Sequence, residues 1–598
     1  MSAMRRAYSA TIEYGIIHIQ TMMTADEIRA RILEVVGKNG GHLASSLGSV
    51  EIAMALADVF DPEKDRIVWD VGHQAYAWKL LTDRGGKSFD TLRLTGGISP
   101  FPNPAESAAD AAVAGHAGAA LSVAAGLAAA RDRKGTDERV VAVIGDASIV
   151  NGTSLEALNN IGAATKRLII VLNDNEMSIS RPVGSIAKML GRLISSVSYN
   201  RVKTAAERVG HRLGLTFMRS IYHRVESRVK SWFLGNAFFE QFGVRYMGPV
   251  DGHDLEKLKA AFTVARDDKR SVLVHVVTKK GKGHPPAESN PTAWHGVSPS
   301  GGGAKKPGWS ETFGGILSAA ARRDSRIVAL TAAMRDGTGL SAFAKEVPDR
   351  FFDVGISEGH MVAFAAGLAA GGMRPVVAVY STFLQRAVDQ VMHDVCISKL
   401  PVVFCVDRAG VVGQDGATHQ GVFDIAMLRC LPNLTIVQPC NAVEFERLFR
   451  EAMDRDGPTV IRYPRGVPPE PAMSAMPDGL AVEVANPDAA VQIWATGDML
   501  EKALAVSERT GAGVVYARSL KPFDENLLRR QRNAGRRIVS LENGSVEGGF
   551  GEAIGADAKL GWPDKFVPHG KVAELEKLFG LDVESIEATV NLLEVSKG

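Results

Sequence analysis

The stretch RVVAVIGDASIVNGTSLEALNNIGAATKRLIIVLNDN, residues 139–175, contains two apolar runs separated by a helical pattern. The runs RVVAVIGD (139–146) and RLIIVLND (167–174) have the length and composition of buried strands. Between them, TSLEALNNIGAA (153–164) repeats its apolar residues with helical spacing. A strand–helix–strand crossover of this kind makes the two strands parallel. The stretch therefore predicts an α/β fold with a parallel sheet.

Both predicted strands end in polar residues that suit neither a strand nor a core. Gly145 and Asp146 end the first strand, and Asn173, Asp174 and Asn175 end the second. One interpretation is a loop cap, because Asn and Asp favour turns. The other is that these oxygens face a ligand at the carboxyl edge of the sheet. Asp146 and Asn175 then supply two oxygen ligands to one Mg²⁺, and Gly145 lets the backbone approach a diphosphate.

This arrangement resembles the thiamine diphosphate and metal motif of the transketolase-like enzymes. A thiamine enzyme also needs a carboxylate beside the aminopyrimidine ring, where a hydrogen bond to the ring nitrogen favours the imino tautomer. The segment FFDVGISEGHMVAFAAGLA (351–369) offers Glu358 for this role, at the end of a predicted strand and before a helix. A helix-capping glutamate is the alternative, and the order of the parts along the chain favours the cofactor role.

Longer motifs make the resemblance specific. The chain is similar to the 1-deoxy-D-xylulose-5-phosphate synthases, a family of transketolase-like enzymes, from about residue 40 to 466 and more loosely beyond. Transketolases proper share the metal motif and the glutamate, but not DVGHQAY with DRAG…DGATHQG. The matching segments are GHLASSLG (41–48), RIVWDVGHQAY (66–76), LNDNEMSIS (172–180), YMGPVDGHD (246–254), TKKGKG (278–283), PDRFFDV (348–354), YSTFLQRA (380–387), DRAGVVGQDGATHQGVFD (407–424), RYPRG (462–466), SLKPFDENLL (519–528) and LENGSVEGGFG (541–551).

The α/β pattern restarts twice along the chain, so we expect three α/β domains with mostly parallel sheets. The segment PSGGGAKKPG (299–308) is the best linker candidate because it is rich in glycine and lysine. With the resemblance, the expected fold is the transketolase-like, thiamine diphosphate-binding fold. The expected parts are an N-terminal extension (1–22), a diphosphate- and Mg²⁺-binding domain (23–300), a linker (301–308), a pyrimidine-binding domain (309–475) and a C-terminal domain of transketolase type (476–598).

The resemblance implies an enzyme, a transferase that uses thiamine diphosphate and Mg²⁺. It implies that pyruvate condenses with D-glyceraldehyde 3-phosphate, which releases CO₂ and forms 1-deoxy-D-xylulose 5-phosphate, a precursor of isoprenoids, thiamine and pyridoxal. It also implies a homodimer in which the site lies between the first and second domains of one chain.

The resemblance also assigns roles to individual residues. Arginine forks match phosphate oxygens, and histidine suits proton transfer near neutral pH. The expected metal ligands are Asp146, Asn175 and Met177. Contacts with thiamine diphosphate are expected from His73, His116, Gly145, Asp146, Ala147, Ser148, Asn175, Met177, Lys280, Glu358 and Phe383. Contacts with substrate are expected from His42, Tyr380, Arg386, Arg408, Asp415, His419 and Arg465. Catalytic roles are expected for Glu358, His42, His73, His295 and His419.

Several residues near the expected cofactor depart from the family pattern. Residues 117–120 read Ala-Gly-Ala-Ala in place of Ser-Ser-Thr-Ser, and residues 147–152 read Ala-Ser-Ile-Val-Asn-Gly in place of Gly-Ala-Met-Thr-Ala-Gly. Gly359 replaces a glutamine, and His284 replaces a tyrosine. Two alternatives therefore stay open: a specialised transketolase-like or acyl-transfer paralogue with another acceptor, and a non-catalytic homologue. Thiamine chemistry is favoured because all expected ionic residues remain: Asp146, Asn175, Glu358, Arg408 and Arg465.

The bulk composition narrows the class of protein. A chain of 598 residues is too long for a single core. A net charge of +2 gives no field for nucleic acid or a membrane surface, so neither is expected as a partner. The four cysteines contain no CxxC pair, which argues against a zinc site or a disulfide framework and favours a cytoplasmic setting.

Overall fold

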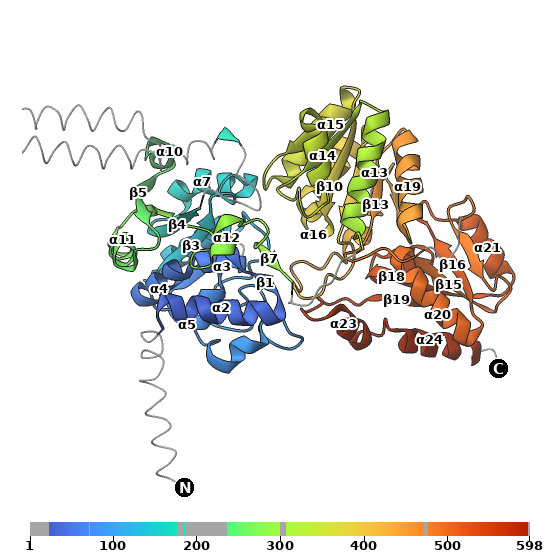
Figure 1. The fold of residues 1–598 in the computed structure, drawn as a ribbon, viewed down its shortest axis with the longest axis horizontal. Helices are drawn as coiled ribbons and strands as arrows, with labels where there is room; N and C mark the ends of the chain where they lie inside the picture. The colour runs from blue at the N-terminus through green and yellow to red at the C-terminus, as the bar shows by residue number, and fades with distance from the viewer. Residues whose placement is uncertain are drawn as a thin grey trace, which may run out of the picture. The chain divides into compact units, whose positions relative to one another are not determined.

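The structure is a computed structural model that describes residues 23–70, 72–175, 184–185, 236–298, 306–470 and 476–595 (Figure 1). The chain forms two compact units: residues 1–93 with 97–301, and residues 94–96 with 302–598. Each unit has its own sheets and core. The expected N-terminal extension at 1–22, the expected metal ligand Met177 and residues 301–305 of the expected linker lie outside the described residues.

The first unit is built on a parallel sheet of five strands in the order β2-β3-β4-β6-β5. Strands β3 and β4 are neighbours, and α7 is the crossover between them, so the prediction for residues 139–175 is confirmed. The strands are β2 (Arg66–Trp69), β3 (Val140–Gly145), β4 (Leu168–Asp174), β5 (Val244–Asp251) and β6 (Ser271–Val277). A separate antiparallel pair joins β1 (Gly41–His42) to β7 (Gly296–Val297).

Helices cover both faces of this sheet (Figure 1). Val141 and Val143 pack with α2, α4 and α5 on one face, whereas Ala142 and Ile144 pack with α6 and α7 on the other. The helices are α2 (Ala25–Asn39), α3 (Ala44–Gly48), α4 (Val50–Val59), η1 (Gly72–Gln74), α5 (Tyr76–Leu81), η2 (Gly86–Thr91), α6 (Ala120–Lys134), α7 (Gly152–Ala164), α10 (Asn236–Gln241), α11 (Leu255–Asp267) and α12 (Pro285–Ser289).

Local signals explain where two of these helices begin. Thr24 and Glu27 form a capping box at the start of α2, as the sequence predicts. The side chain of Asn151 accepts a hydrogen bond from the Thr153 N–H and caps α7. Both caps satisfy N–H groups that have no partner inside the helix.

The second unit contains two sheets. One has seven strands in the order β17-β12-β13-β11-β10-β8-β9, and the other has five in the order β14-β16-β15-β18-β19. The pairs β12–β17 and β14–β16 are antiparallel, and the remaining pairs are parallel. The strands are β8 (Ile327–Thr331), β9 (Phe351–Asp353), β10 (Arg374–Tyr380), β11 (Val403–Asp407), β12 (Thr435–Val437), β13 (Thr459–Arg462), β14 (Val482–Ala485), β15 (Val491–Thr496), β16 (Gly513–Ala517), β17 (Ser519–Lys521), β18 (Arg537–Ser545) and β19 (Ala558–Trp562).

The helices of this unit begin with α13 and end with α24, near the C-terminus (Figure 1). They are α13 (Trp309–Arg323), α14 (Ser341–Glu346), η3 (Pro348–Arg350), α15 (Glu358–Ala370), α16 (Ser381–Leu384), η4 (Gln385–Ala387), α17 (Val388–Gln390), η5 (Val391–Cys396), α18 (Asp424–Leu428), α19 (Ala442–Asp454), η6 (Gly497–Met499), α20 (Leu500–Thr510), α21 (Glu525–Asn533), α22 (Phe550–Ala553), α23 (Val572–Leu578) and α24 (Val583–Val595). Within the described residues, no helix has both the length and the hydropathy needed to cross a membrane.

The two sheets of the second unit are joined more closely than the sequence indicates. Strand β17 lies in the chain among the strands of the five-stranded sheet, yet it pairs with β12 of the seven-stranded sheet. One apolar cluster contains Val377 from β10 together with Trp494 from β15. The fold is therefore α/β with mostly parallel sheets, as predicted, while the expected domain bounds at 309–475 and 476–598 stay a prediction.

Candidate functional site

The carboxyl edge of the first unit's sheet carries a buried carboxylate with an unsatisfied oxygen. Gly145 pairs with Asn173 across β3 and β4, so Asp146 and Asn175 follow neighbouring strand ends. Oδ1 of Asp146 accepts a hydrogen bond from the Ala147 N–H at 3.0 Å, whereas Oδ2 is buried and has no hydrogen-bond partner among the residues that the structure describes. A buried, unbonded carboxylate oxygen is costly, and binding a hard cation would remove that cost. The residues present therefore fit a Mg²⁺ ion.

Two neighbouring charges act on Asp146. Burial, together with the nearby Asp174 carboxylate, raises the pKa of Asp146 to about 8, against the opposing effects of the Ala147 N–H and Lys280. Lys280 is also buried, and burial lowers its pKa to about 8 although Asp146 favours its charged form. A buried ammonium group next to this carboxylate fits the oxygens of a diphosphate.

Two polar side chains at the end of β4 form hydrogen bonds within the protein. The Asn173 side chain donates to Gln74 Oε1 at 2.9 Å and accepts from Thr278 Oγ1 at 2.6 Å. Oδ2 of Asp174 lies 3.0 Å from Nε2 of His275, whose Nδ1 lies 2.7 Å from the Tyr246 hydroxyl. The side chains of Asn173 and Asp174 therefore bond to η1 and to residues in or just after β6, while Asn175 stays the predicted metal ligand from this strand end.

Three expected histidines lie together in the first unit. The ring centroids of His42, His73 and His295 are 5.2–5.7 Å apart. Nδ1 of His295 lies 3.4 Å from the hydroxyl of Ser45. Burial first, and then the neighbouring Lys280 and histidines, hold the pKa of His295 well below its ordinary value. A neutral imidazole in such a cluster can accept a proton.

The loop before α6 shows how two departures from the family pattern are accommodated. The N–H of Gly118 donates to both carboxylate oxygens of Asp70, at 2.9 and 3.0 Å, so this amide is already used within the protein. Gly118 has a φ of +87°, and a Cβ there would lie 2.5 Å from Cγ of Asn151. The missing side chain at position 118 and the longer one at position 151 therefore occupy complementary space. The expected His116 lies in the same loop.

The turn after β3 contains the other two residues expected near the diphosphate. Ala147 and Ser148 follow Asp146 directly, and the Ser148 N–H donates to the Gly145 carbonyl at 3.0 Å. Ser148 is buried. Both residues thus lie in a tight turn at the strand end where the metal ligands are expected.

In the second unit, four expected residues gather where the neighbouring strands β10 and β11 end. The ring of Tyr380 stacks on Phe383 with centroids 5.8 Å apart, and Phe383 meets the ring of His419 edge-on at 5.6 Å. Cζ of Arg408 lies 3.7 Å above the Tyr380 ring, and its Nη1 donates to the Gly337 carbonyl at 2.9 Å. These contacts fix the Arg408 guanidinium in place.

A second arginine lies near this group. Nη1 of Arg465 is 3.8 Å from Oδ2 of Asp415, and half of the Arg465 side chain is exposed. It also donates to the Val412 carbonyl at 3.5 Å. An exposed guanidinium fork held by weak contacts can bind a phosphate group bidentately.

Glu358 is the first residue of α15 and is almost completely buried. Within the described part of the chain its Oε2 has no hydrogen-bond partner, and Nη1 of Arg386 lies 3.7 Å away from it. Burial raises the pKa of Glu358, against the opposing effect of Arg386. A carboxyl group in this state can share a proton with a ring nitrogen, so the residue fits the aminopyrimidine of thiamine diphosphate.

The structure thus groups the expected residues into two sets. His42, His73, His116, Gly145, Asp146, Ala147, Ser148, Asn175, Lys280 and His295 lie in the first unit, and Glu358, Tyr380, Phe383, Arg386, Arg408, Asp415, His419 and Arg465 lie in the second. The sequence analysis gave no role to the buried Gln74 and His275 or to the partly buried Tyr246. A single histidine inside the apolar run SVLVHVV (271–277) was the available signal for His275.

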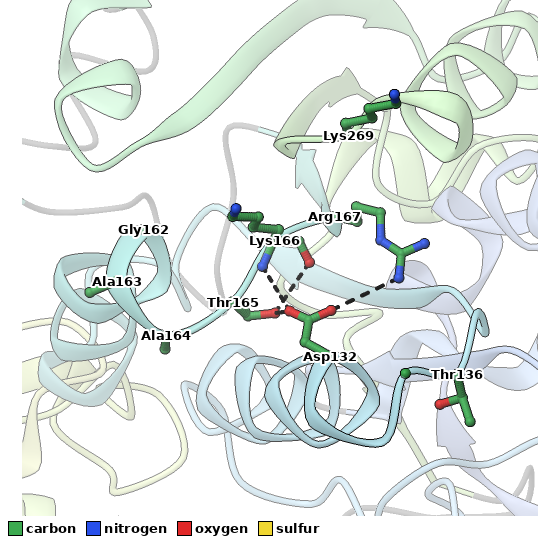
Figure 2. A pocket seen from close by; sticks show the side chains of 10 residues that line it. Asp132, Thr136, Gly162, Ala163, Ala164, Thr165, Lys166, Arg167 and Lys269 are labelled. Atoms are coloured by element: carbon green, nitrogen blue, oxygen red, sulfur yellow. Dashed lines mark hydrogen bonds and ion pairs between the residues drawn. The ribbon is translucent and has the colours of Figure 1, made fainter.

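A hollow of about 660 Å³ lies at the opposite, amino-terminal edge of the first unit's sheet (Figure 2). Its lining includes Asp132, Lys166, Arg167 and Lys269, and none of the expected site residues. Asp132 accepts hydrogen bonds from the Thr165 hydroxyl and the Lys166 N–H (Figure 2). Helices α6 and α7 end here, so the basic residues complement the negative ends of two helix dipoles. This hollow is therefore not where a diphosphate is expected.

Comparisons with known proteins show the family to which the chain belongs. Residues 16–278 match the family model described as 1-deoxy-D-xylulose-5-phosphate synthase, residues 305–470 match the transketolase pyrimidine binding domain, and residues 480–586 match the transketolase C-terminal domain. These matches define a transketolase-like enzyme, a transferase class that depends on thiamine diphosphate.

The full-length relatives narrow this class to one family. The 1-deoxy-D-xylulose-5-phosphate synthase of Oleidesulfovibrio alaskensis is 45% identical and covers 96% of this chain and 94% of its own length. The 1-deoxy-D-xylulose-5-phosphate synthase 1 of Geobacter metallireducens is 44% identical over 96% of this chain and 97% of its own. The chain belongs to the 1-deoxy-D-xylulose-5-phosphate synthase family. Among solved structures, the transketolase from Campylobacter jejuni subsp. jejuni NCTC 11168 is similar at 18% identity, with a TM-score of 0.43 and coverage of 96% of this chain and 99% of that one.

Proposed function

We propose that this chain condenses pyruvate with D-glyceraldehyde 3-phosphate to form 1-deoxy-D-xylulose 5-phosphate and CO₂, with thiamine diphosphate and Mg²⁺. When bound, thiamine diphosphate supplies a nucleophilic carbon and an electron sink. The observation that carries the proposal concerns Asp146 and Glu358. Each has a buried carboxylate oxygen that no described residue hydrogen-bonds, at the two positions where the family resemblance places an anion beside the cofactor.

The first unit holds the charged end of the cofactor in this proposal. Asp146 and Asn175 would hold Mg²⁺ through side-chain oxygens, and Met177, which lies outside the described residues, stays a predicted ligand. Lys280 would offset the charge of the diphosphate from its buried position. The turn at Ala147 and Ser148 would lie beside the diphosphate.

The second unit orients the aminopyrimidine. Glu358, whose pKa is raised by burial, would share a proton between its Oε2 and the ring nitrogen. Phe383 would pack against the ring. Arg386 lies 3.7 Å from Glu358 and limits how far that pKa rises.

The acceptor aldehyde is bound by a set of polar side chains in the same unit. Arg408 and Arg465 bind the phosphate of D-glyceraldehyde 3-phosphate as guanidinium forks. Asp415 and His419 bind its hydroxyl and aldehyde groups, and Tyr380 holds Arg408 through its ring.

In this proposal, histidines of the first unit transfer protons during the reaction. His295 is kept neutral by burial, and it is in ring contact with His42 and His73. A neutral imidazole can take a proton from one group and return it to another. His116 contacts the cofactor in this proposal. In this proposal the protein is a homodimer that acts in the cytoplasm. Sedimentation of the purified protein tests the oligomeric state.

The experiment supplies the purified protein with thiamine diphosphate, Mg²⁺ and pyruvate, with and without D-glyceraldehyde 3-phosphate. CO₂ release and the mass of the sugar product are followed together. CO₂ with a five-carbon deoxyketose phosphate supports the proposal. CO₂ without that product leaves the thiamine chemistry in place and indicates another acceptor. No CO₂ under either condition contradicts the proposal.

A further inference from the structure

The loop formed by residues 279–283, here called the Lys280 loop, is anchored on both sides of Lys280. The N–H of Lys279 donates to Nε2 of His253 at 2.8 Å. The N–H of Gly281 donates to the Ala44 carbonyl at 2.7 Å. Because both neighbouring peptide groups are fixed, the direction in which Lys280 leaves the backbone is fixed as well.

The hydrogen bond from Lys279 determines which nitrogen of His253 carries the proton. Nε2 accepts this bond, so the ring proton is on Nδ1, which lies 3.1 Å from Oε2 of Glu51. Nη2 of Arg29 lies 2.7 Å from each carboxylate oxygen of Glu51. Burial alone would raise the pKa of Glu51, but the hydrogen bonds from His253 and Arg29 outweigh it and lower that pKa. Glu51 is therefore ionised and holds the His253 ring in this orientation.

This relay of Arg29, Glu51 and His253 connects separate parts of the first unit. Arg29 lies on α2, Glu51 on α4, and His253 follows β5, where its own N–H donates to Oδ1 of Asp251 at 3.0 Å. Arg29 and Glu51 are buried, with exposed fractions of 5% and 6%. Two buried side chains and the partly buried His253, from distant segments, thus form a chain of hydrogen bonds that ends at the Lys279 N–H.

The glycines around the Lys280 loop leave little space for the loop to shift. A Cβ at Gly48 would lie 3.0 Å from the Lys279 carbonyl oxygen, and a Cβ at Gly283 would lie 2.8 Å from Cδ of Arg29. Glu288 holds the far side of the loop, because its carboxylate pairs with Nζ of Lys279 and accepts from the Gly283 N–H. The Lys280 loop is therefore held against the relay by close packing as well as by hydrogen bonds.

We propose that His253 is a positioning residue for the cofactor: with Glu51 and Arg29 it holds the Lys280 loop so that the Lys280 ammonium stays next to Asp146. The part that concerns the cofactor rests on the proposed function, in which Lys280 offsets the diphosphate charge. The part that concerns the loop rests only on the hydrogen bonds of the free protein. His253 itself acts through the Lys279 N–H and does not touch the cofactor.

The test compares His253→Ala, His253→Gln and a matched control, Lys257→Ala, with the wild type. A glutamine amide carries an NH₂ group that donates and an oxygen that accepts, so it can donate to Glu51 and accept from the Lys279 N–H. Lys257 lies on α11, shortly after His253 in the chain. Its side chain is 66% exposed and forms an ion pair with Asp254. The first measurement is amide hydrogen exchange of residues 279–283 in the cofactor-free protein. The second is the dissociation constant of thiamine diphosphate with Mg²⁺, measured by titration calorimetry, with unphosphorylated thiamine as a second probe.

We expect His253→Ala to speed amide exchange in the loop by about tenfold or more and to weaken thiamine diphosphate binding by about tenfold, with thiamine binding nearly unchanged. His253→Gln is expected to restore most of both effects, and Lys257→Ala to cause neither. Unchanged exchange in His253→Ala would overturn the role in holding the loop. Faster exchange with unchanged thiamine diphosphate affinity would reduce His253 to a structural residue. If the wild type binds no thiamine diphosphate, the proposed function fails, whereas the exchange result still decides the role in the loop.

Discussion

In the first unit, burial makes the ionised form of Asp146 costly. Its usual pKa of 3.8 is raised to about 8 in the folded protein, mainly by burial and then by Asp174. At pH values between these two pKa values, the Asp146 carboxyl group is deprotonated in the unfolded chain and protonated in the folded chain. The free energy of unfolding of the cofactor-free protein therefore falls as pH rises from about 4 to about 8.

Replacing Asp146 with asparagine removes this cost. We expect Asp146→Asn to raise the melting temperature of the cofactor-free protein more at pH 8 than at pH 5, by a few degrees, for a gain on the order of 1–3 kcal/mol. The same variant is expected to lose the stabilisation by Mg²⁺ and thiamine diphosphate that a bound ligand gives the wild type. Melting curves at both pH values, with and without the ligands, check this. An equal gain at the two pH values would contradict the argument.

The wild type should show a matching pH dependence of cofactor binding. A metal must displace the Asp146 proton, so affinity for thiamine diphosphate at fixed Mg²⁺ is expected to rise by up to about tenfold per pH unit toward pH 8. Above that pH, Lys280 loses its charge, since its pKa is also about 8, and affinity is expected to fall. Titrations between pH 6 and pH 9 measure the profile. A flat profile would exclude both groups from the binding site.

A substitution at Glu358 is expected to affect catalysis much more than cofactor binding. In Glu358→Gln the amide still fills the space but cannot share a proton with the aminopyrimidine nitrogen. We expect the rate of CO₂ release to fall by about 10²–10⁴-fold, while the dissociation constant of thiamine diphosphate stays within about tenfold. Rates at saturating cofactor and calorimetric titrations provide the two numbers. A large loss of affinity with an unchanged rate would assign Glu358 to binding alone.

At the scale of elements, the loop before α6 and the start of α7 have changed together. The family pattern has Ser at position 118 and Ala at position 151, whereas this chain has Gly118 and Asn151. Asn151 caps α7, and its side chain occupies the space that a Cβ at position 118 would need. The two departures therefore compensate each other and do not by themselves indicate a lost site.

A double-mutant cycle tests this compensation. Gly118→Ser alone is expected to destabilise the protein by roughly 2–4 kcal/mol, because the new Cβ strikes Asn151 and the φ of +87° is strained. Asn151→Ala alone removes a helix cap and is expected to cost about 1 kcal/mol. The double variant should be clearly less destabilised than the sum of the two. Denaturant unfolding of all four proteins measures the coupling, and strict additivity would contradict it.

For the whole molecule, the apolar runs at 139–146 and 167–174 predicted β3 and β4, because a buried strand leaves a continuous local signal. Strand β17 was not predicted, since Ser519–Lys521 is short and its partner β12 lies far away in the chain. The strand ends at Asp146 and Asn175 could be found because two parallel neighbours must end on one edge. The bonds of Asn173 to Gln74 and Thr278 could not, because they join residues that only the folded sheet brings together.

The role of Arg462 could not be predicted from the sequence either. Arg462 is buried and lies close in the chain to Arg465, the residue expected to bind phosphate. Its guanidinium pairs with Asp424, donates to Gln438 Oε1 at 2.6 Å and donates to the Asn543 carbonyl at 2.9 Å. Because Arg462 ends β13 and Asn543 lies in β18, this one side chain joins the two sheets of the second unit. Nothing in RYPRG distinguishes its structural arginine from its exposed one.

Substituting methionine at each position separates the two arginines. Arg462→Met leaves the Asp424 carboxylate buried without its ion-pair partner, so we expect a loss of about 3–5 kcal/mol in the free energy of unfolding. Arg465→Met is expected to change that free energy by less than about 0.5 kcal/mol, because the side chain is half exposed, and to raise the KM for D-glyceraldehyde 3-phosphate instead. Denaturant unfolding and steady-state kinetics of both variants measure this contrast. If Arg465→Met were the more destabilising change, the assignment of one arginine to the sheet junction and the other to the acceptor phosphate would be wrong.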